Sequence, residues 1–318
     1  MYQVFIDGKE GTTGLQIVER LRAREDIEIL EIESNKRKIE SEKRKLIEKA
    51  DVVILCLPDK ASQQVVNENA EIPGTKFIDA STAFRIHPDW TYGLPELSKK
   101  QRELVGESQR VSNPGCYATG FVIPIKPLID QGVLNPSSEL TISAISGYSG
   151  GGRSLIERYE KKSFNSSARL WPARQYSLSL NHKHLPEMRR YTGLKSNPVF
   201  LPVVANFYQG MTVNISIPKG MFSKKISIQD IQGIMKEVYD EQENIKIYDV
   251  NDEKQLDEGF LDPERASNSD LLEIFTFGHD DQVLLTSRLD NLGKGAAGAA
   301  LQNLNLMLGL PEYKGLKI

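Results

Sequence analysis

Residues 111–120 read Val-Ser-Asn-Pro-Gly-Cys-Tyr-Ala-Thr-Gly. The stretch joins a strand to a helix, because Pro114 keeps Asn113 out of the helical region and Gly115 tolerates backbone shapes that other residues resist. Cys116 therefore stands near the start of a helix, where the helix dipole and unpaired N–H groups favour a thiolate. A small buried thiol is the alternative at this point. Apolar residues continue at close to helical spacing: Phe121, Val122, Ile125, Leu128 and Ile129.

Length, composition and charge limit the classes of protein to which the chain can belong. Its 318 residues are enough for two domains, and 39% hydrophobic with 26% charged residues suits a water-soluble globular protein. The net charge of −3 gives no basic field for nucleic acid. We find no apolar run that could span a bilayer and no secretory signal. Two cysteines cannot build a disulfide framework, so we expect a cytoplasmic protein. From the charge and the lack of a spanning segment, we expect neither a nucleic-acid partner nor a membrane partner.

The N-terminal region predicts a dinucleotide-binding turn. An apolar strand at residues 4–6 is followed by three glycines in the spacing Gly-x-x-Gly-x-x-Gly and then by an amphipathic helix. In this context backbone N–H groups can hold a pyrophosphate at the start of the helix. A tight turn without a ligand is the alternative. The candidate cofactor-binding residues are Gly8, Gly11, Thr12, Thr13 and Gly14.

The end of the second strand, expected at residues 27–32, discriminates between cofactors. Glu33 could accept the ribose 2′-hydroxyl of NAD. Ser34, Lys36 and Arg37 instead suit a 2′-phosphate, so we expect NADP(H). The alternative is that these residues form only the solvated start of a charged helix.

Further strands complete a parallel sheet in the first half of the chain. Residues 51–57 are almost continuously apolar, which is typical of a parallel sheet covered on both faces, and they place Cys56 in the core. Strands at residues 76–79 and 110–113 follow. Their carboxyl ends place Ser81 and Arg85 at the edge where α/β sheets bind ligands.

The second half predicts an α+β domain with a mixed or antiparallel sheet. Helices are expected at residues 154–162 and 227–242, and residues 163–180, which carry Arg169, Trp171 and Arg174, are expected to form an irregular flap. The strands at 199–205 and 211–217 are expected to be antiparallel. The full set of expected strands is 140–145, 199–205, 211–217, 245–250, 271–277 and 282–289.

Two further segments carry candidate catalytic chemistry. His182 and His184 would face the same way in an extended chain, and Pro186 suits the first position of a helix. A His-x-His pair can bind a metal, but no third ligand is evident, so we expect acid–base chemistry and no metal. Gly295 to Ala300 form a helix of small residues that returns to the first domain.

The motifs together resemble the N-acetyl-gamma-glutamyl-phosphate reductases of the shorter type, from residue 2 to about residue 309. The motifs that match are the glycine turn, Ser-Asn-Pro-Gly-Cys-Tyr-Ala-Thr, Ser-Gly-Tyr-Ser-Gly-Gly-Gly-Arg (146–153), His-Lys-His-Leu-Pro-Glu (182–187) and Asp-Asn-Leu-Gly-Lys-Gly-Ala-Ala-Gly (290–298). Gly151 stands where the family commonly has alanine. Aspartate-semialdehyde dehydrogenases are related in fold and chemistry.

The resemblance implies a Rossmann-like NADP-binding domain (residues 1–115 and 290–318) and a catalytic and oligomerisation domain (residues 116–289). It implies that Cys116 attacks the acyl phosphate of N-acetyl-glutamyl 5-phosphate to give a thioester, which NADPH reduces to the semialdehyde in arginine biosynthesis. His184 or His182 would be the acid–base, and a homodimer or homotetramer is implied. Asn291 and Gly295 would hold the nicotinamide end. Candidate substrate-binding residues are Ser81, Arg85, Asn113, Arg153 and Glu187.

Three alternatives stay open at this stage. The same chemistry could act on another acyl phosphate, such as aspartyl or aminoadipyl phosphate. A cysteine hydrolase would turn over its substrate without a dinucleotide. A regulator that senses NADP would bind the dinucleotide without turnover.

Overall fold

The computed structural model describes residues 1–33, 35–37, 39–164 and 170–318, and it forms two compact units. Unit 1 comprises Met1–Pro114 and Ala296–Leu316, and unit 2 comprises Gly115–Gly295 and Lys317–Ile318. The chain thus enters unit 2 directly before Cys116 and leaves it directly after Gly295. Residues 290–295, which the sequence placed in the first domain, cluster with unit 2.

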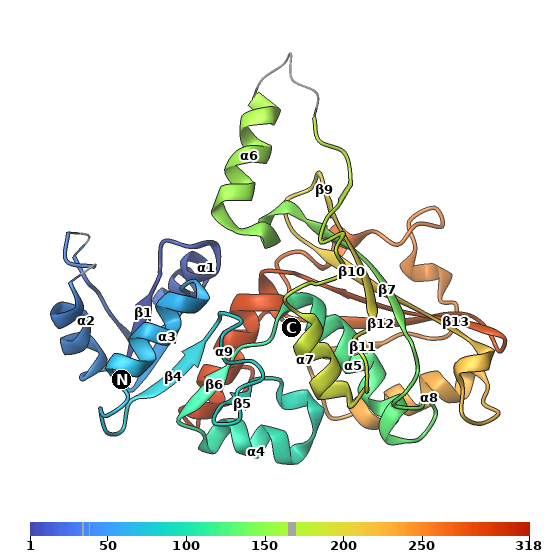
Figure 1. The fold of residues 1–318 in the computed structure, drawn as a ribbon, viewed down its shortest axis with the longest axis horizontal. Coiled ribbons are helices and arrows are strands. Elements are labelled where there is room, and N and C mark those ends of the chain that lie inside the picture. Colours follow the sequence, from blue (N-terminus) through green and yellow to red (C-terminus); the bar gives the residue numbers. More distant parts are fainter. Residues whose placement is uncertain (34, 38, 165–169) are drawn as a thin grey trace. The chain divides into compact units, whose positions relative to one another are not determined.

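Unit 1 is built on a six-stranded sheet in which every pairing is parallel (Figure 1). The strand order is β2-β1-β3-β4-β6-β5. Because β2 and β3 lie on opposite sides of β1, the carboxyl ends of β1 and β3 form the topological switch point, where such sheets bind ligands. The strands are β1 (Tyr2–Asp7), β2 (Ile27–Leu30), β3 (Val52–Leu55), β4 (Lys76–Asp79), β5 (Thr91–Tyr92) and β6 (Arg110–Ser112).

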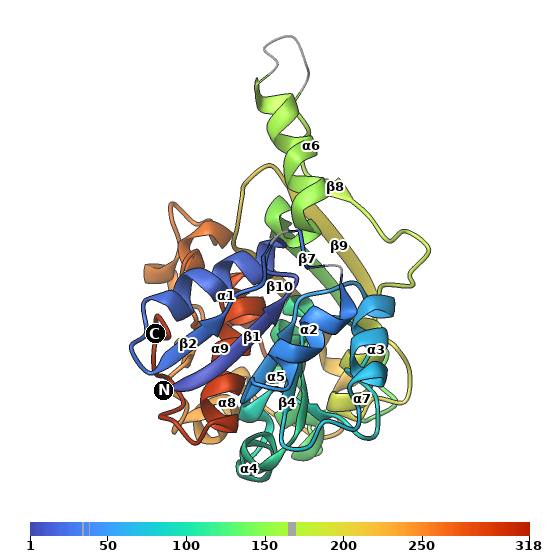
Figure 2. The same ribbon diagram turned by 90° about the vertical axis from the view of Figure 1, so that its left-hand side faces the viewer.

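Helices cover both faces of this sheet, as Figure 2 shows for α1 and α9 beside β1 and for α2 and α3. Side chains alternate along β1: Val4 and Ile6 join a core with α1, α4 and α9, whereas Phe5 joins a core with α2 and α3. Helix α9 belongs to unit 1, where its apolar side chains join the core that it shares with α1 and α4. The helices are α1 (Thr12–Arg22), α2 (Glu40–Ile47), α3 (Asp59–Glu68), α4 (Lys99–Glu107) and α9 (Gly298–Met307).

Unit 2 is built on a mixed seven-stranded sheet with the order β11-β12-β13-β10-β7-β9-β8. The expected fold class of both domains is confirmed. Strands 199–205 and 211–217 run antiparallel, as expected, but they do not pair directly, because β7 lies between them: Ser143 faces Leu201 on one side and Asn214 on the other. The strands are β7 (Thr141–Gly147), β8 (Arg174–Gln175), β9 (Val199–Ala205), β10 (Met211–Pro218), β11 (Ile245–Ile247), β12 (Leu272–His279) and β13 (Gln282–Leu289).

Helix α5 (Cys116–Asp130) is buried along most of its length against this sheet. Gly120 permits the approach, because a Cβ there would lie 2.8 Å from Val213. Pro127 cannot donate to the carbonyl of Ile123, and the Tyr239 hydroxyl donates to that carbonyl instead, at 2.6 Å. The other helices of unit 2 are α6 (Gly152–Phe164), α7 (Leu185–Thr192) and α8 (Ile228–Tyr239).

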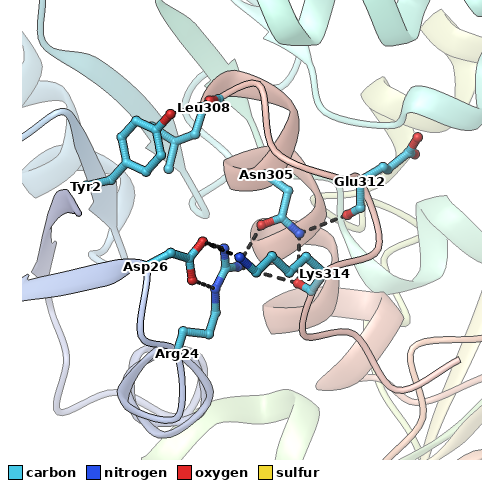
Figure 3. A network of polar contacts seen from close by, with 7 residues as sticks. All are labelled: Tyr2, Arg24, Asp26, Asn305, Leu308, Glu312 and Lys314. Carbon is cyan, nitrogen blue, oxygen red and sulfur yellow. Dashed lines mark hydrogen bonds and ion pairs between the residues drawn. The ribbon is translucent and has the colours of Figure 1, made fainter.

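A polar network fastens the C-terminal segment to unit 1 (Figure 3). The buried Arg24 guanidinium donates to both carboxylate oxygens of Asp26, at 3.0 and 2.7 Å, and to the side-chain oxygen of Asn305 at 2.6 Å. Asn305 in turn donates to the carbonyls of Glu312 and Lys314. Arg24, followed by Lys314, holds the pKa of Asp26 well below its usual value, although burial opposes the shift.

We expect Asp26→Asn to destabilise unit 1 by about 1–2 kcal/mol near pH 7, because it removes one partner of the Arg24 pair. A lowered folded-state pKa means that this contribution is fully present above about pH 4 and declines progressively as the pH falls from there to the folded value. The measurement is urea unfolding in a Trp171→Phe background, where Trp90 is the tryptophan that reports on unit 1. An equal loss of stability near pH 7 and near pH 3 would contradict this account.

Candidate active site

Cys116 is the first residue of α5, as the sequence predicts, and its side chain is partly exposed. Gly115 is the N-cap residue, with extended backbone angles, and its carbonyl accepts from the Thr119 N–H at 2.8 Å. The thiol is thus attached at the positive end of a helix dipole, where ionisation to thiolate is favoured. The N–H of Gly115 donates to the buried carboxylate of Glu187 at 3.1 Å.

The closing segment packs against Cys116 through Gly295. A Cβ on Gly295 would lie 2.7 Å from the Cys116 Cβ, so only glycine permits this approach. The carbonyl of Asp290 accepts from the Gly295 N–H at 2.9 Å, and the Asp290 carboxylate accepts from Gln209 and from the Asn268 N–H, both at 2.7 Å. These bonds explain why residues 290–295 belong to unit 2. The closing segment continues into a π-helical turn, Gly293–Ala297, of a kind often found at functional sites.

Both polar atoms of the Asn291 amide are engaged within unit 2. Its oxygen accepts from the Gly210 N–H at 2.8 Å, and its nitrogen donates to Ser149 Oγ at 2.9 Å. Asn291 thereby ties the closing segment to the start of β10 and to the glycine-rich turn after β7. Its expected contact with the nicotinamide stays a prediction.

His182 and His184 are buried and adjacent, with ring centroids 4.7 Å apart. The chain between them is not extended. His184 is the helical N-cap residue of α7, and its backbone N–H donates to Nδ1 of His182 at 3.1 Å. When its Nδ1 accepts a hydrogen bond, neutral His182 carries its proton on Nε2.

Two tyrosines that the sequence analysis did not select complete this cluster. Tyr117 lies edge-on to His182, and its hydroxyl is 3.1 Å from that of Tyr176, which is also edge-on to His182. Burial raises the pKa of both phenols above the usual value, so both stay neutral. Tyr117 could have been found from its place beside Cys116, whereas Tyr176 lies in an irregular segment without a pattern.

Arg153 does not join this cluster. It lies on α6 with an exposed side chain and donates to Glu157 at 3.0 Å. Arg169, from the expected flap, lies outside the described residues. Among the described residues, no group of three His, Cys, Asp or Glu side chains is arranged to hold a metal ion, and no helix is long and apolar enough to cross a membrane.

In unit 1 the glycine turn lies at the switch point of the sheet. Gly8 has φ +87°, and a Cβ there would lie 2.3 Å from the carbonyl oxygen of Cys56, which follows β3. A Cβ on Gly14 would lie 2.5 Å from the Gly8 carbonyl oxygen. Gly11 is the N-cap of α1, followed by Thr12 and Thr13, whose N–H groups belong to the first helical turn. The close chain approach and the open helix start fit a bound pyrophosphate.

Cys56 packs against the core and is chemically unlike Cys116. Burial, and then the charges of Asp79 and Asp7, raise the pKa of its thiol to about 12. Cys56 is therefore a thiol at neutral pH, and thiolate chemistry falls to Cys116.

The basic segment after β2 forms surface ion pairs. Lys36 Nζ lies 2.8 Å from a Glu33 carboxylate oxygen, and Arg37 lies 3.6 Å from the carboxylate of Glu10. Ser34, the third residue expected at the ribose, lies outside the described residues. Lys36 is thus paired with Glu33, the acidic residue that could have bound the ribose 2′-hydroxyl of NAD.

Ser81, Arg85 and Asn113 come together at the carboxyl ends of β4 and β6. Arg85 Nε donates to the Asn113 carbonyl at 3.0 Å, and Ser81 Oγ donates to the buried carboxylate of Asp79 at 2.6 Å. Burial raises the Asp79 pKa to about 6, against the lowering effect of its serine partners and of Arg85. Asp79 was not among the expected site residues. A buried strand end such as Phe-Ile-Asp is its sequence signal.

Comparison with known families agrees with this arrangement. Residues 3–104 match the NAD-binding domain of semialdehyde dehydrogenases, and residues 116–291 match the dimerisation domain of the same enzymes. The fold and the two matches define an NAD(P)-binding oxidoreductase of the semialdehyde dehydrogenase class. A solved structure of aspartate semialdehyde dehydrogenase II from Vibrio cholerae has the same fold, with a TM-score of 0.71 and 15% identity over 97% of this chain and 98% of that one.

Full-length relatives define the family within that class. N-acetyl-gamma-glutamyl-phosphate reductase 2 of Nostoc sp. and N-acetyl-gamma-glutamyl-phosphate reductase of Trichormus variabilis are each 44% identical over 321 residues, covering 99% of both chains in each case. This chain belongs to the N-acetyl-gamma-glutamyl-phosphate reductase family.

Proposed function

We propose that this chain reduces N-acetyl-L-glutamyl 5-phosphate to N-acetyl-L-glutamate 5-semialdehyde and phosphate, with NADPH, in the arginine biosynthesis of the cytoplasm. The observation that carries the proposal is the partly exposed Cys116 at the start of α5, packed against Gly295, in a chain 44% identical to reductases of that name. The Cys116 thiolate attacks the acyl carbon, phosphate leaves, and a thioester forms on the sulfur.

NADP(H) binding is proposed for the glycine turn, with the pyrophosphate on Gly8, Gly11 and the first turn of α1. When bound, NADPH supplies the hydride that reduces the thioester. Lys36 and Arg37, with Ser34, would bind the 2′-phosphate, and the Lys36–Glu33 pair supports NADP over NAD because it occupies the carboxylate that would bind a 2′-hydroxyl. Asn291 and Gly295 would border the nicotinamide end.

The two histidines can have different roles. A hydrogen bond fixes His182 with Nε2–H as a donor, which suits stabilisation of the oxyanion on the tetrahedral intermediate. His184 is then the group that exchanges protons with substrate. The backbone N–H groups at the start of α5 provide further oxyanion donors. Ser81, Arg85 and Arg153 are the candidates for binding the phosphate or carboxylate groups of the substrate. Asn113 and Glu187 are further candidates for contact with the substrate.

A homodimer or homotetramer is proposed. The match to a dimerisation domain supports it, as do apolar side chains exposed on the face of the sheet away from α5. Ile145, Val199 and Leu201 on that face are 39%, 42% and 37% exposed.

We expect phosphate-dependent reduction of NADP with N-acetyl-glutamate 5-semialdehyde, followed at the nicotinamide absorbance band. NADP should be preferred over NAD by about tenfold or more, because a charge-assisted contact to the 2′-phosphate contributes at least about 1.5 kcal/mol.

Cys116→Ser should lose on the order of a thousandfold in kcat, and Cys56→Ser should keep most activity. Full activity in Cys116→Ser would exclude the thioester, and faster turnover of aspartate or aminoadipate semialdehyde would reassign the substrate.

The histidine roles predict distinct pH–rate profiles. His184→Gln should remove one limb of the profile, because the titrating acid–base is lost. His182→Gln should lower kcat by about 10²-fold while leaving the position of that limb unchanged, as expected for loss of an oxyanion donor. The reverse pattern in the two variants would exchange the assignments.

A further inference from the structure

Glu187 makes a contact that the sequence analysis did not predict. It was expected to bind substrate, yet its Oε2 accepts from the Gly115 backbone N–H at 3.1 Å and its side chain is 1% exposed. Gly115 is the N-cap of α5 and directly precedes the nucleophile. The carboxylate therefore binds the backbone that orients Cys116.

The local sequence explains how Glu187 reaches this position. It stands in the first turn of α7, after Pro186 and the N-cap His184, and α7 packs against α5. A carboxylate in a first turn is stabilised by its own helix dipole. Its bond to the Gly115 N–H also satisfies a backbone donor that is buried at the start of α5.

We propose that Glu187 is a positioning residue, whose carboxylate fixes the Gly115–Cys116 turn and whose negative charge opposes ionisation of the Cys116 thiol. The expected effect of Glu187 on kcat rests on the proposed function, whereas its effect on ionisation of the Cys116 thiol does not. The dipole of α5 favours a thiolate, and a carboxylate bound at the same helix start counteracts it. Such a balance keeps part of the thiol protonated and limits its oxidation when no substrate is bound.

Other groups of unit 2 around Cys116 also contribute to its electrostatic environment. Burial keeps the phenols of Tyr117 and Tyr176 neutral. Asp290 and Lys294 of the closing segment are also buried, and the Asp290 carboxylate is bound to Gln209 and Asn268. The Glu187 carboxylate accepts directly from the backbone N–H of the turn that carries the thiol. The titratable groups of the ring cluster beside Cys116 are Tyr117, Tyr176, His182 and His184, and Tyr191 on α7 faces Glu187. Asp290 and Lys294 are the charged residues of the adjoining closing segment.

Two substitutions separate the two parts of the proposal. Glu187→Gln keeps an oxygen that can accept from Gly115 but removes the charge. Glu187→Asp keeps the charge but shortens the side chain by one methylene group, so the bond to the turn is weakened. The measurement is the pH dependence of Cys116 alkylation by iodoacetamide, read by mass spectrometry of the Cys116 peptide, together with kcat and KM.

We expect Glu187→Gln to shift the alkylation midpoint of Cys116 down by about 0.5 pH unit, because the charge that opposes ionisation is removed. Glu187→Asp should leave the midpoint in place and lower kcat by about 10- to 100-fold with little change in KM. Alkylation needs no turnover, so it reports on Glu187 even if the proposed reaction is wrong.

Glu273→Gln is the matched control, since Glu273 is a buried carboxylate bound to Arg288 at 2.6 Å. Val213 faces α5, and the alternation along β10 and β13 places Arg288 on the opposite face of the sheet. Loss of the Glu273 charge should reduce the free energy of unfolding without shifting the alkylation midpoint of Cys116. An unchanged midpoint in Glu187→Gln, or a raised KM with unchanged kcat in both Glu187 variants, would overturn the proposal and return Glu187 to substrate binding.

Discussion

The approach of Gly295 to Cys116 is the contact on which the rest of the candidate site depends. A Cβ at 295 would lie 2.7 Å from the Cys116 Cβ, a separation that packed atoms do not tolerate. Glycine at this point lets the chain pass the nucleophile and enter α9, which completes the core of unit 1. The lack of a side chain at residue 295 is therefore required both beside the turn that carries Cys116 and by the chain that leads into α9.

Buried carboxylates hold the backbone around this contact. The Asp290 carboxylate binds two other chain segments of unit 2, at Gln209 and Asn268, and Glu187 binds the N–H before Cys116. A buried carboxylate that accepts several N–H bonds is tolerated because those bonds replace its hydration. Such groups fix backbone positions more firmly than apolar packing alone does, and an acyl-transfer site requires that fixation.

Much of this organisation could be predicted from sequence, because local patterns determine it. The parallel sheet, the glycine turn, the helix that begins at Cys116 and the return of the closing helix all follow from apolar periodicity and from Gly and Pro positions. Interactions between distant segments could not be predicted in this way. The insertion of β7 between β9 and β10, the bonds that draw 290–295 into unit 2, and the location of Tyr176 depend on tertiary pairing. The bend between His182 and His184 is likewise a consequence of the N-terminus of α7, which curls the backbone there.

The central claim is that Cys116 carries the acyl group during the reaction. The most direct measurement incubates the protein with N-acetyl-glutamate 5-semialdehyde and NADP without phosphate, followed by acid quench and peptide mass spectrometry. The account predicts an N-acetylglutamyl thioester on the Cys116 peptide that phosphate or NADPH discharges. Reduction of NADP with no adduct on Cys116, or an adduct on another residue, would contradict it.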